Sequence, residues 1–369
     1  MSRTTRIALV FGGVSAEHEI SCVTAGGIFR AIDRSKFTPV GVGITKSGRW
    51  VRVSDAELAS FELSSGQLPY VGENHPDAML LRTAAGVELV TREGDGLSEV
   101  LDIDAAFPVL HGPFGEDGTI QGLFEMLDLP YVGAGVASSA MSMDKDITKK
   151  LLSEAGFEVA KWVLVTRRRW EFEREKVTGE VSALGLPVFV KPARSGSSVG
   201  VSRVTDLAEL PAAIAKAQAQ DPKVIVEEGI LGAREVEIGV IGGRGLNPPR
   251  ASCPGEIVVA GNEGFYDYDA KYRGVDFVSL KAPAEVSQEL AKRLRQVAVG
   301  VFETMLVEGL ARVDTFVVGE RIVVNELNTM PGFTSGSLFP VVWGVSGLPY
   351  TELITELVTL ALGRPLRLR

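Results

Sequence analysis

The chain has 369 residues, of which 45% are hydrophobic and 23% charged, and its formal net charge is -9. This length allows two or three domains with buried cores, and the negative charge argues against a nucleic-acid partner, because phosphate backbones require a basic surface. No apolar run reaches the roughly 18–20 residues of a membrane span. The two cysteines, Cys22 and Cys253, suggest neither a disulfide framework nor a metal knuckle. These features are typical of a cytoplasmic enzyme without membrane contact.

Signals for strands and helices alternate in the first third of the chain. Short apolar runs predict strands, and longer stretches with helical periodicity predict helices. The predicted strands are at 7–11, 37–44 and 105–110, and the predicted helices are at 21–32 and 119–127. Such alternation favours a doubly wound parallel sheet. Residues 66–100 lack this pattern and are predicted to form a peripheral insertion or hairpin.

A break at 131–135 precedes a second region, in which Asp144 is the predicted cap of a helix that ends near Gly156. Further strands are predicted at 162–165, 188–190, 224–227, 235–241, 255–259 and 275–280, and further helices at 208–219, 287–306 and 351–362. The chain is therefore predicted to be an α/β protein with three domains, at residues 1–140, 141–232 and 233–369.

Four polar side chains near the end of the chain are spaced for one face of a β-hairpin. Arg312 and Asp314 flank a valine, and Glu326 and Asn328 flank a leucine. Residues two apart on a strand face the same side of the sheet. Two carboxylates and an amide oxygen suit Mg²⁺ better than zinc or copper. A solvated hairpin face is the alternative, but the small-residue loop at 329–338 favours a ligand site.

The register of this hairpin is constrained by the sequence separation. Asp314 and Glu326 are an even number of residues apart, so direct pairing on one face requires an odd-numbered loop or a bulge. We expect a three-residue loop at 319–321, with Val318 opposite Ile322.

Two lysines stand where phosphate groups could bind. Lys191 opens a Gly/Ser-rich loop at 191–200, which can present backbone N–H groups to phosphate oxygens. The loop does not match the Walker A pattern, and a flexible linker is the alternative. Lys145 follows the Asp144 cap at a helix N-terminus, where free N–H groups favour anions. The run at 133–138 only half matches a dinucleotide fingerprint, and we reject it as a nicotinamide site.

Three further segments carry candidate ligands. A predicted strand ends in Glu227 and Glu228, which could contact a nucleoside, although an ordinary strand end with solvated acids is the alternative. Three tyrosines and a lysine crowd residues 265–272, which favours a loop that closes over a ligand. Glu17 and His111 each follow a strand of the first sheet, at the edge where ligands bind in α/β proteins.

Taken together, these segments resemble the D-alanine–D-alanine ligases of the ATP-grasp superfamily. The match covers nearly the whole chain, and seven stretches occur in the family's order: 12–21, 111–118, 142–145, 191–200, 266–272, 312–314 and 326–338. The resemblance implies a three-domain ATP-grasp architecture. It also implies ATP-dependent ligation of two D-alanines through an acyl phosphate, for peptidoglycan precursor synthesis.

The resemblance implies roles for individual residues as well. Glu17, Ser197 and Tyr272 would form a catalytic network that ties a lid to the substrate, and we choose Arg312 as the donor to the oxyanion. The implied ligands of the two D-alanines are His111, Gly332, Ser337 and Leu338. The implied nucleotide ligands are Lys145, Lys191, Ser198, Glu227, Glu228, Ile230, Glu235 and Lys271. The implied metal ligands are Asp314, Glu326 and Asn328.

The resemblance further implies ATP as a substrate, two Mg²⁺ ions for which Mn²⁺ can substitute, and a homodimer. Two alternatives stay open. A D-alanine–D-lactate ligase has the same fold and first step and is distinguished at the lid position, which is Tyr272 here. A nucleotide-binding regulatory protein without turnover belongs to a different class, and the intact Arg312 and metal ligands argue against it.

Overall fold

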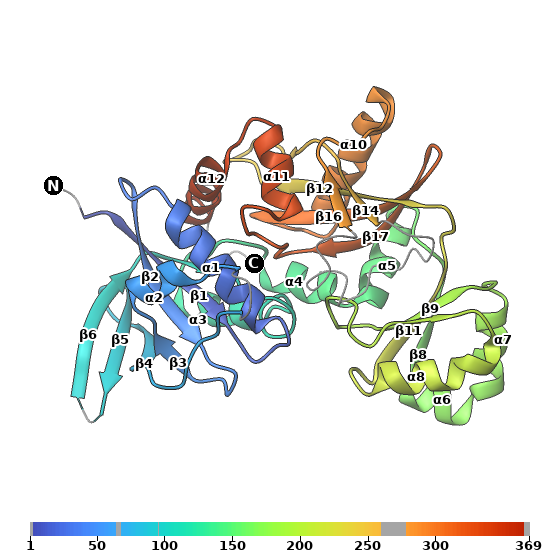
Figure 1. Cartoon of the computed structure of the whole chain (residues 1–369), viewed down its shortest axis with the longest axis horizontal. Helices are drawn as coiled ribbons and strands as arrows, with labels where there is room; N and C mark the ends of the chain where they lie inside the picture. Colours follow the sequence, from blue (N-terminus) through green and yellow to red (C-terminus); the bar gives the residue numbers. More distant parts are fainter. Residues whose placement is uncertain (1–2, 64–67, 95, 260–277, 365–369) are drawn as a thin grey trace.

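The computed structural model describes residues 3–63, 68–94, 96–259 and 278–364. They form three β-sheets that follow one another along the chain (Figure 1). None of the helices within these residues is long and apolar enough to cross a membrane. The predicted α/β class is confirmed by this architecture.

The first sheet has seven strands in the order β6-β5-β4-β3-β2-β1-β7. They are β1 (Thr5–Gly12), β2 (Phe37–Ile44), β3 (Trp50–Arg52), β4 (Asp77–Arg82), β5 (Val87–Glu93), β6 (Gly96–Ile103) and β7 (Ala105–Pro108). Its helices are α1 (His18–Ala31), α2 (Asp55–Ser60) and α3 (Thr119–Leu127). Strand β1 is apolar on both faces: Ile7 and Leu9 belong to one buried cluster and Ala8 and Val10 to another, as in a strand covered on both sides.

The sheet is mixed rather than purely parallel, which corrects the expectation from the sequence. Strand β1 is parallel to β2 and β7, but the pairs from β2 to β6 are antiparallel. Short turns join β4, β5 and β6, whereas a parallel connection needs a crossover of roughly a dozen residues or more. The predicted peripheral hairpin is confirmed as the arm formed by these three strands.

The second sheet has four antiparallel strands in the order β10-β9-β11-β8. They are β8 (Trp162–Thr166), β9 (Val188–Pro192), β10 (Ser202–Val204) and β11 (Lys223–Glu228). The helices around it are α6 (Arg167–Phe172), α7 (Arg174–Ser182), a 3-10 turn at Leu207–Glu209 and α8 (Leu210–Gln218). Two helices, α4 (Val136–Met143) and α5 (Lys145–Glu154), connect the first sheet to the second, and Asp144 caps α5 as predicted.

The third sheet has the strand order β15-β14-β12-β16-β17, with β13 paired to β12. Its strands are β12 (Arg234–Ile241), β13 (Arg250–Ala251), β14 (Gly255–Val259), β15 (Val278–Lys281), β16 (Leu310–Val318) and β17 (Arg321–Asn328). Its helices are α10 (Gln288–Thr304), α11 (Leu338–Val345) and α12 (Tyr350–Leu362). The three sheets occupy successive parts of the chain, and the domain boundaries stay a prediction.

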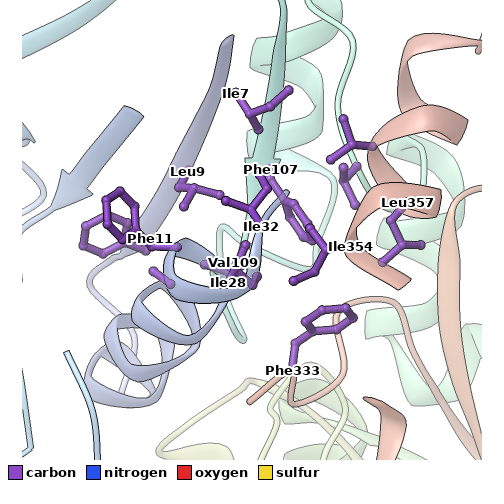
Figure 2. Close-up of a cluster of buried hydrophobic side chains, with 14 of the residues drawn as sticks. Ile7, Leu9, Phe11, Ile28, Ile32, Phe107, Val109, Phe333, Ile354 and Leu357 are labelled. Atoms are coloured by element: carbon purple, nitrogen blue, oxygen red, sulfur yellow. The ribbon is translucent and has the colours of Figure 1, made fainter. Parts of the chain in front are cut away.

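One hydrophobic cluster joins the two ends of the chain. Figure 2 shows Leu9 of β1 and Phe107 of β7 beside Phe333 and Ile354, which come from the last 40 residues. The ring of Phe333 lies 6.0 Å from that of Phe107, at a steep interplanar angle typical of an edge-to-face contact. Helix α12 therefore packs on the first sheet, and the loop before α11 lies against that sheet.

We expect Phe333→Ala to lower the free energy of unfolding by about 3–5 kcal/mol, the range for removing a buried phenylalanine ring. The side chain of Phe333 is fully buried and contacts three aromatic rings. Urea unfolding followed by fluorescence gives the measurement. Phe172→Ala, at a site that is 78% exposed, is the control and should change it by about 0.5 kcal/mol or less. Equal effects of the two variants would show that the cluster does not join the ends of the chain.

Candidate active site

The β16–β17 hairpin brings together the four polar residues that the sequence singles out. Arg312 lies opposite Asn328, and Asp314 lies opposite Glu326. Directly opposite residues of antiparallel strands share a face, so all four side chains are on one side of the third sheet. The predicted pairing of the two carboxylates is confirmed.

The turn that joins these strands differs from the expected one. Val318 pairs with Arg321 rather than with Ile322, so the loop has two residues instead of three. Gly319 begins it with φ of 60°, the positive φ that tight hairpin turns require and that glycine adopts without strain. A bulge at Asn325 restores the pairing of the carboxylates, because the register shifts by one residue there.

Arg312 is held by two carboxylates on this face. Its Nε and Nη2 donate to the two oxygens of Asp314, each at 2.7 Å, and its Nε lies 2.9 Å from an oxygen of Glu237. Burial would lower the pKa of Arg312, but these negative charges raise it well above its ordinary value. Asn328 also donates to Asp314, at 2.8 Å. Arg312 therefore remains a cation of fixed orientation.

The donor chemistry of this face fits a hard cation. Asp314, Glu326 and Asn328 offer only oxygen atoms as ligands, the set that Mg²⁺ prefers. Within the described ranges no group of three His, Cys, Asp or Glu side chains is arranged to hold a metal, so the asparagine amide is needed to complete three protein ligands.

Lys145 connects this face to the loop at 191–200. Its Nζ donates to the carbonyl of Ser195 at 2.8 Å and lies 3.9 Å from an oxygen of Glu326. Its backbone N–H donates to the carbonyl of Ala193 at 3.0 Å. The first turn of α5, the Gly/Ser loop and a candidate metal ligand therefore meet at one place.

Lys191 and the acids Glu227 and Glu228 lie on the two central strands of the second sheet, β9 and β11. Lys191 forms an ion pair of 2.9 Å with Glu227, whose other oxygen pairs with Lys149 at 2.9 Å. Glu228 accepts from the backbone N–H of Lys161 at 2.8 Å. The sequence analysis did not single out Lys149. The structure thus places Glu227 inside an ion-pair cluster, not at an open strand end.

The remaining predicted nucleotide ligands are more dispersed. Ser198 is half-buried in the loop with φ of 58°, a left-handed conformation that is uncommon outside glycine. Ile230 is half-buried just after β11, and Glu235 stands on β12 opposite Ile257. Lys271 and Tyr272 lie outside the described residues.

Glu17 meets the same loop from the first sheet. The hydroxyl of Ser197 donates a short hydrogen bond to the Glu17 carboxylate, and a Cβ on Gly196 would lie 3.2 Å from that carboxylate. Two members of the expected Glu17–Ser197–Tyr272 network are therefore in contact.

His111 is buried beside Met330. Its Nδ1 donates to the Met330 carbonyl at 3.1 Å, and burial lowers the pKa of the ring. The imidazole is thus neutral at pH 7, with the proton on Nδ1. Its Nε2 is buried and has no hydrogen-bond partner in the part of the chain that the structure describes, so a free acceptor atom is available for a ligand.

The loop before α11 carries the last predicted substrate ligands. The hydroxyl of Ser337 accepts from the N–H of Thr334 at 3.1 Å, and a Cβ on Gly332 would lie 3.2 Å from it. Leu338 is buried and opens α11, so its N–H is one of the unpaired donors at a helix start. Gly332, Ser337 and Leu338 are brought together.

Two family models match the chain over most of its length. The D-ala D-ala ligase N-terminus matches residues 6–134, and the D-ala D-ala ligase C-terminus matches residues 151–359. The chain belongs to the D-alanine–D-alanine ligase family. It is 47% identical over 367 residues to a D-alanine–D-alanine ligase of Arthrobacter sp. strain FB24, with 99% of this chain and 96% of the relative covered. A D-alanine–D-alanine ligase of Kineococcus radiotolerans is 48% identical over 372 residues, with 99% and 98% covered.

Solved structures of ligases share the fold. The VanG D-Ala:D-Ser ligase from Enterococcus faecalis superposes with a TM-score of 0.80 at 34% identity, covering 97% of this chain and 100% of that one. The D-alanine–D-alanine ligase from Coxiella burnetii gives 0.80 at 29% identity, covering 98% and 94%. These comparisons confirm the resemblance, the fold class and the assignment to an enzyme of the ligase family.

Three charged residues that lie in or beside the candidate site were not predicted from the sequence: Glu116, Lys149 and Glu237. Glu237 could have been found, because it alternates with Glu235 on a strand beside the Arg312 strand. Glu116 lies in the predicted 111–118 segment and accepts from the N–H of Gly112 at 2.8 Å. Burial raises the pKa of Glu116 to about 8, and the nearby charge of Glu17 adds to the effect.

The raised pKa of Glu116 predicts a pH dependence of stability. Between its ordinary pKa of 4.5 and about 8, the folded protein keeps a proton that the unfolded chain has lost. Stability from this group is therefore complete below pH 4.5 and is lost as pH rises toward 8. Glu116→Gln should lose less thermal stability between pH 5 and 8 than the wild type. Glu171→Gln on the exposed side of α6 is the control, and parallel curves for Glu116→Gln and the wild type would contradict the prediction.

Proposed function

We propose that this chain uses ATP to join two D-alanine molecules into D-alanyl-D-alanine. The observation that carries the proposal is the 3.9 Å approach of Lys145, on the phosphate-binding side, to Glu326, on the metal-binding side. A γ-phosphoryl group at this junction would be next to both the Gly/Ser loop and the carboxylate face. Full-length similarity to D-alanine–D-alanine ligases supports the choice of substrate.

The chemistry follows from charge. A carboxylate is a poor acceptor for an amine, so ATP would first phosphorylate one D-alanine to an acyl phosphate. Lys145 and Lys191 would bind the phosphates, and Glu17 would pair with the ammonium group of that D-alanine. His111 would lie near its carboxylate. Because the Met330 carbonyl takes the Nδ1 proton, the ring would have to gain a second proton, on Nε2, before it could donate to that carboxylate.

The amine of the second D-alanine, once deprotonated, would then attack the acyl carbon, which forms the peptide bond and releases inorganic phosphate. Ser337 and the N–H of Leu338 would receive its carboxylate; their position at the start of α11 supports this role. Arg312 would donate to the developing oxyanion, and its contact with Glu237 would keep it oriented once Asp314 binds the cation. Ser198, Glu228, Ile230, Glu235 and Lys271 complete the proposed nucleotide ligands. Glu227 was expected among them, but each of its two oxygens pairs with a lysine, so we propose that it acts through Lys191 and does not touch the nucleotide.

We assign the metal site to Asp314, Glu326 and Asn328, with two Mg²⁺ ions or Mn²⁺ in their place. When bound, the ions would neutralise charge on the transferring phosphoryl group. To bind the cation, Asp314 would give up its contacts with Arg312 and Asn328. Because ATP is supplied inside the cell, the proposed reaction belongs to the cytoplasm. The homodimer stays a proposal that light scattering would test.

The decisive experiment mixes the protein with ATP, Mg²⁺ and D-alanine and measures dipeptide by mass and ADP by coupled assay. D-alanyl-D-alanine and ADP in equal amounts are expected. ATP bound without turnover would favour the regulatory alternative, and product only with D-lactate present would favour the depsipeptide ligase.

Arg312→Ala should lower kcat by at least about 10²–10³, the scale of losing one oxyanion donor. The affinity for ATP should change much less, because the developing charge arises after the nucleotide has bound. Steady-state kinetics and nucleotide titration give the two quantities. Arg293→Ala is the matched control, since its ion pair with Glu320 is exposed. Loss of nucleotide binding with kcat preserved would make Arg312 a phosphate ligand instead.

The choice of the second substrate is proposed to depend on Tyr272. The structural likeness to a D-Ala:D-Ser ligase supports the idea that ligases of one fold differ in their second substrate through a few side chains. The Tyr272 hydroxyl could extend the hydrogen bond between Ser197 and Glu17 and hold a closed lid in one geometry. Removing that hydroxyl should relax discrimination and leave acyl-phosphate formation in place.

Tyr272→Phe should therefore gain D-alanyl-D-lactate synthesis, mainly at lower pH. There the amino group of D-alanine is protonated and must lose a proton before it attacks, whereas the hydroxyl group of D-lactate is neutral. Products formed from equal D-alanine and D-lactate are analysed across pH 6 to 9. Tyr70→Phe, at a residue 54% exposed, serves as control. If Tyr272→Phe made only dipeptide at every pH, the specificity would be set by other residues, and Ser337 would be the first to test.

A further inference from the structure

A buried lysine on α5 has no part in the mechanism above. The side chain of Lys149 is only 1% exposed and forms its ion pair with Glu227, which is equally enclosed. Lys149 lies four residues after Lys145, so the two share one face of the helix. Burial of a charged lysine costs free energy unless the lysine is paired, and Lys149 lies beside Lys145 and Lys191, the proposed phosphate ligands.

Glu227 is shared between two lysines through separate oxygens. Oε1 lies 2.9 Å from Lys149, and Oε2 lies 2.9 Å from Lys191. Lys191 and Glu227 come from neighbouring strands and are diagonal neighbours on one sheet face, since Phe189 lies opposite Glu227. Burial alone would raise the pKa of Glu227, but the two lysines lower it to about 2. The carboxylate is therefore ionised. Burial lowers the pKa of Lys149 and the charge of Glu227 opposes this shift, so with both lysines protonated the cluster has one net positive charge.

We propose that Lys149 is a positioning residue for the nucleotide: it neutralises Glu227, so that the charge of Lys191 is available to a phosphate group. Lys191 has three donor hydrogens and can keep its contact with Glu227 while it binds a phosphate oxygen. Without Lys149, Glu227 and Lys191 would form a neutral pair. A phosphate would then have to compete with the carboxylate for Lys191 and would also be repelled by it. This inference rests on the proposed ATP-binding role of Lys191.

Lys149→Met keeps the length of the side chain and removes its charge. The dissociation constants of ATP and ADP, measured by calorimetry without D-alanine, should rise about tenfold or more, the scale of one charge acting across several ångströms in a protein. In steady-state assays KM for ATP should rise similarly. KM for D-alanine and kcat at saturating ATP should stay within about threefold of wild type.

Two further variants separate this charge effect from a general loss of structure. Lys150→Met is the matched control: Lys150 is the next residue on α5, is 58% exposed and also forms an ion pair of 2.9 Å, with Asp146. Its nucleotide affinity should equal that of the wild type. Lys149→Met combined with Glu227→Gln should bring the affinity back to within about threefold of wild type, because no carboxylate then competes for Lys191.

The outcome for the double variant decides the proposal even if Lys149→Met does not fold. A folded double variant that binds ATP as poorly as Lys149→Met, or about tenfold worse than wild type, would overturn it, because a charge effect must be relieved when the carboxylate is removed. Unchanged ATP binding by folded Lys149→Met would overturn it as well. Failure of the proposed function looks different, since the wild-type protein would then bind no ATP or form no dipeptide.

Discussion

The bulge at Asn325 is the constraint on which the site depends. Side chains alternate along a strand, so a shift of one residue would turn Glu326 away from Asp314. The same shift would bring a carboxylate into the core of the third sheet, where Leu327 is now only 3% exposed. Burial of an unpaired carboxylate costs several kcal/mol or more. The hydrophobic core and the proposed metal site therefore enforce one register, and the tight turn at Gly319 requires the extra residue that makes this register possible.

Two central charges of the site, the Arg312 cation and the Glu227 anion, each have two partners of opposite charge, so that one contact can be given up. Arg312 contacts both Asp314 and Glu237. Glu227 contacts both Lys191 and Lys149. If a ligand draws Asp314 away, Arg312 keeps Glu237, and if a phosphate draws Lys191 away, Glu227 keeps Lys149. Because an unpaired charge in a low-dielectric interior is expensive, a second partner lowers the cost of exchanging the first for a ligand.

The local elements could be predicted from the sequence, and the contacts between distant segments could not. The Asp144 cap and the alternation around Arg312 and Glu326 depend on neighbours along the chain, so they are visible in the residues themselves. The predicted loop length at Gly319 was wrong, because the even separation of Asp314 and Glu326 allows either an odd-numbered loop or a bulge. The ion pair of Lys149 with Glu227 joins residues 78 positions apart, and a lysine on a helix gives no signal that it is buried. A peripheral hairpin at 66–100 could be predicted from the local sequence, but its attachment to β3, which makes the first sheet mixed, is set by packing and could not.

Apolar packing holds the loops that carry His111 and Ser337, which are proposed to bind D-alanine, whereas polar contacts hold the second sheet to them. Phe333 packs between Phe107 and Phe339, which fixes the loop that reaches His111 through the Met330 carbonyl. The second sheet has a core of its own and meets the others through bonds such as Lys145 to Ser195 and Ser197 to Glu17. Water or a ligand can replace a polar contact at small net cost, whereas parting the phenylalanine cluster would expose apolar surface. A ligand that replaces these polar contacts would therefore disturb the loops of His111 and Ser337 less than a change that parts the phenylalanine cluster.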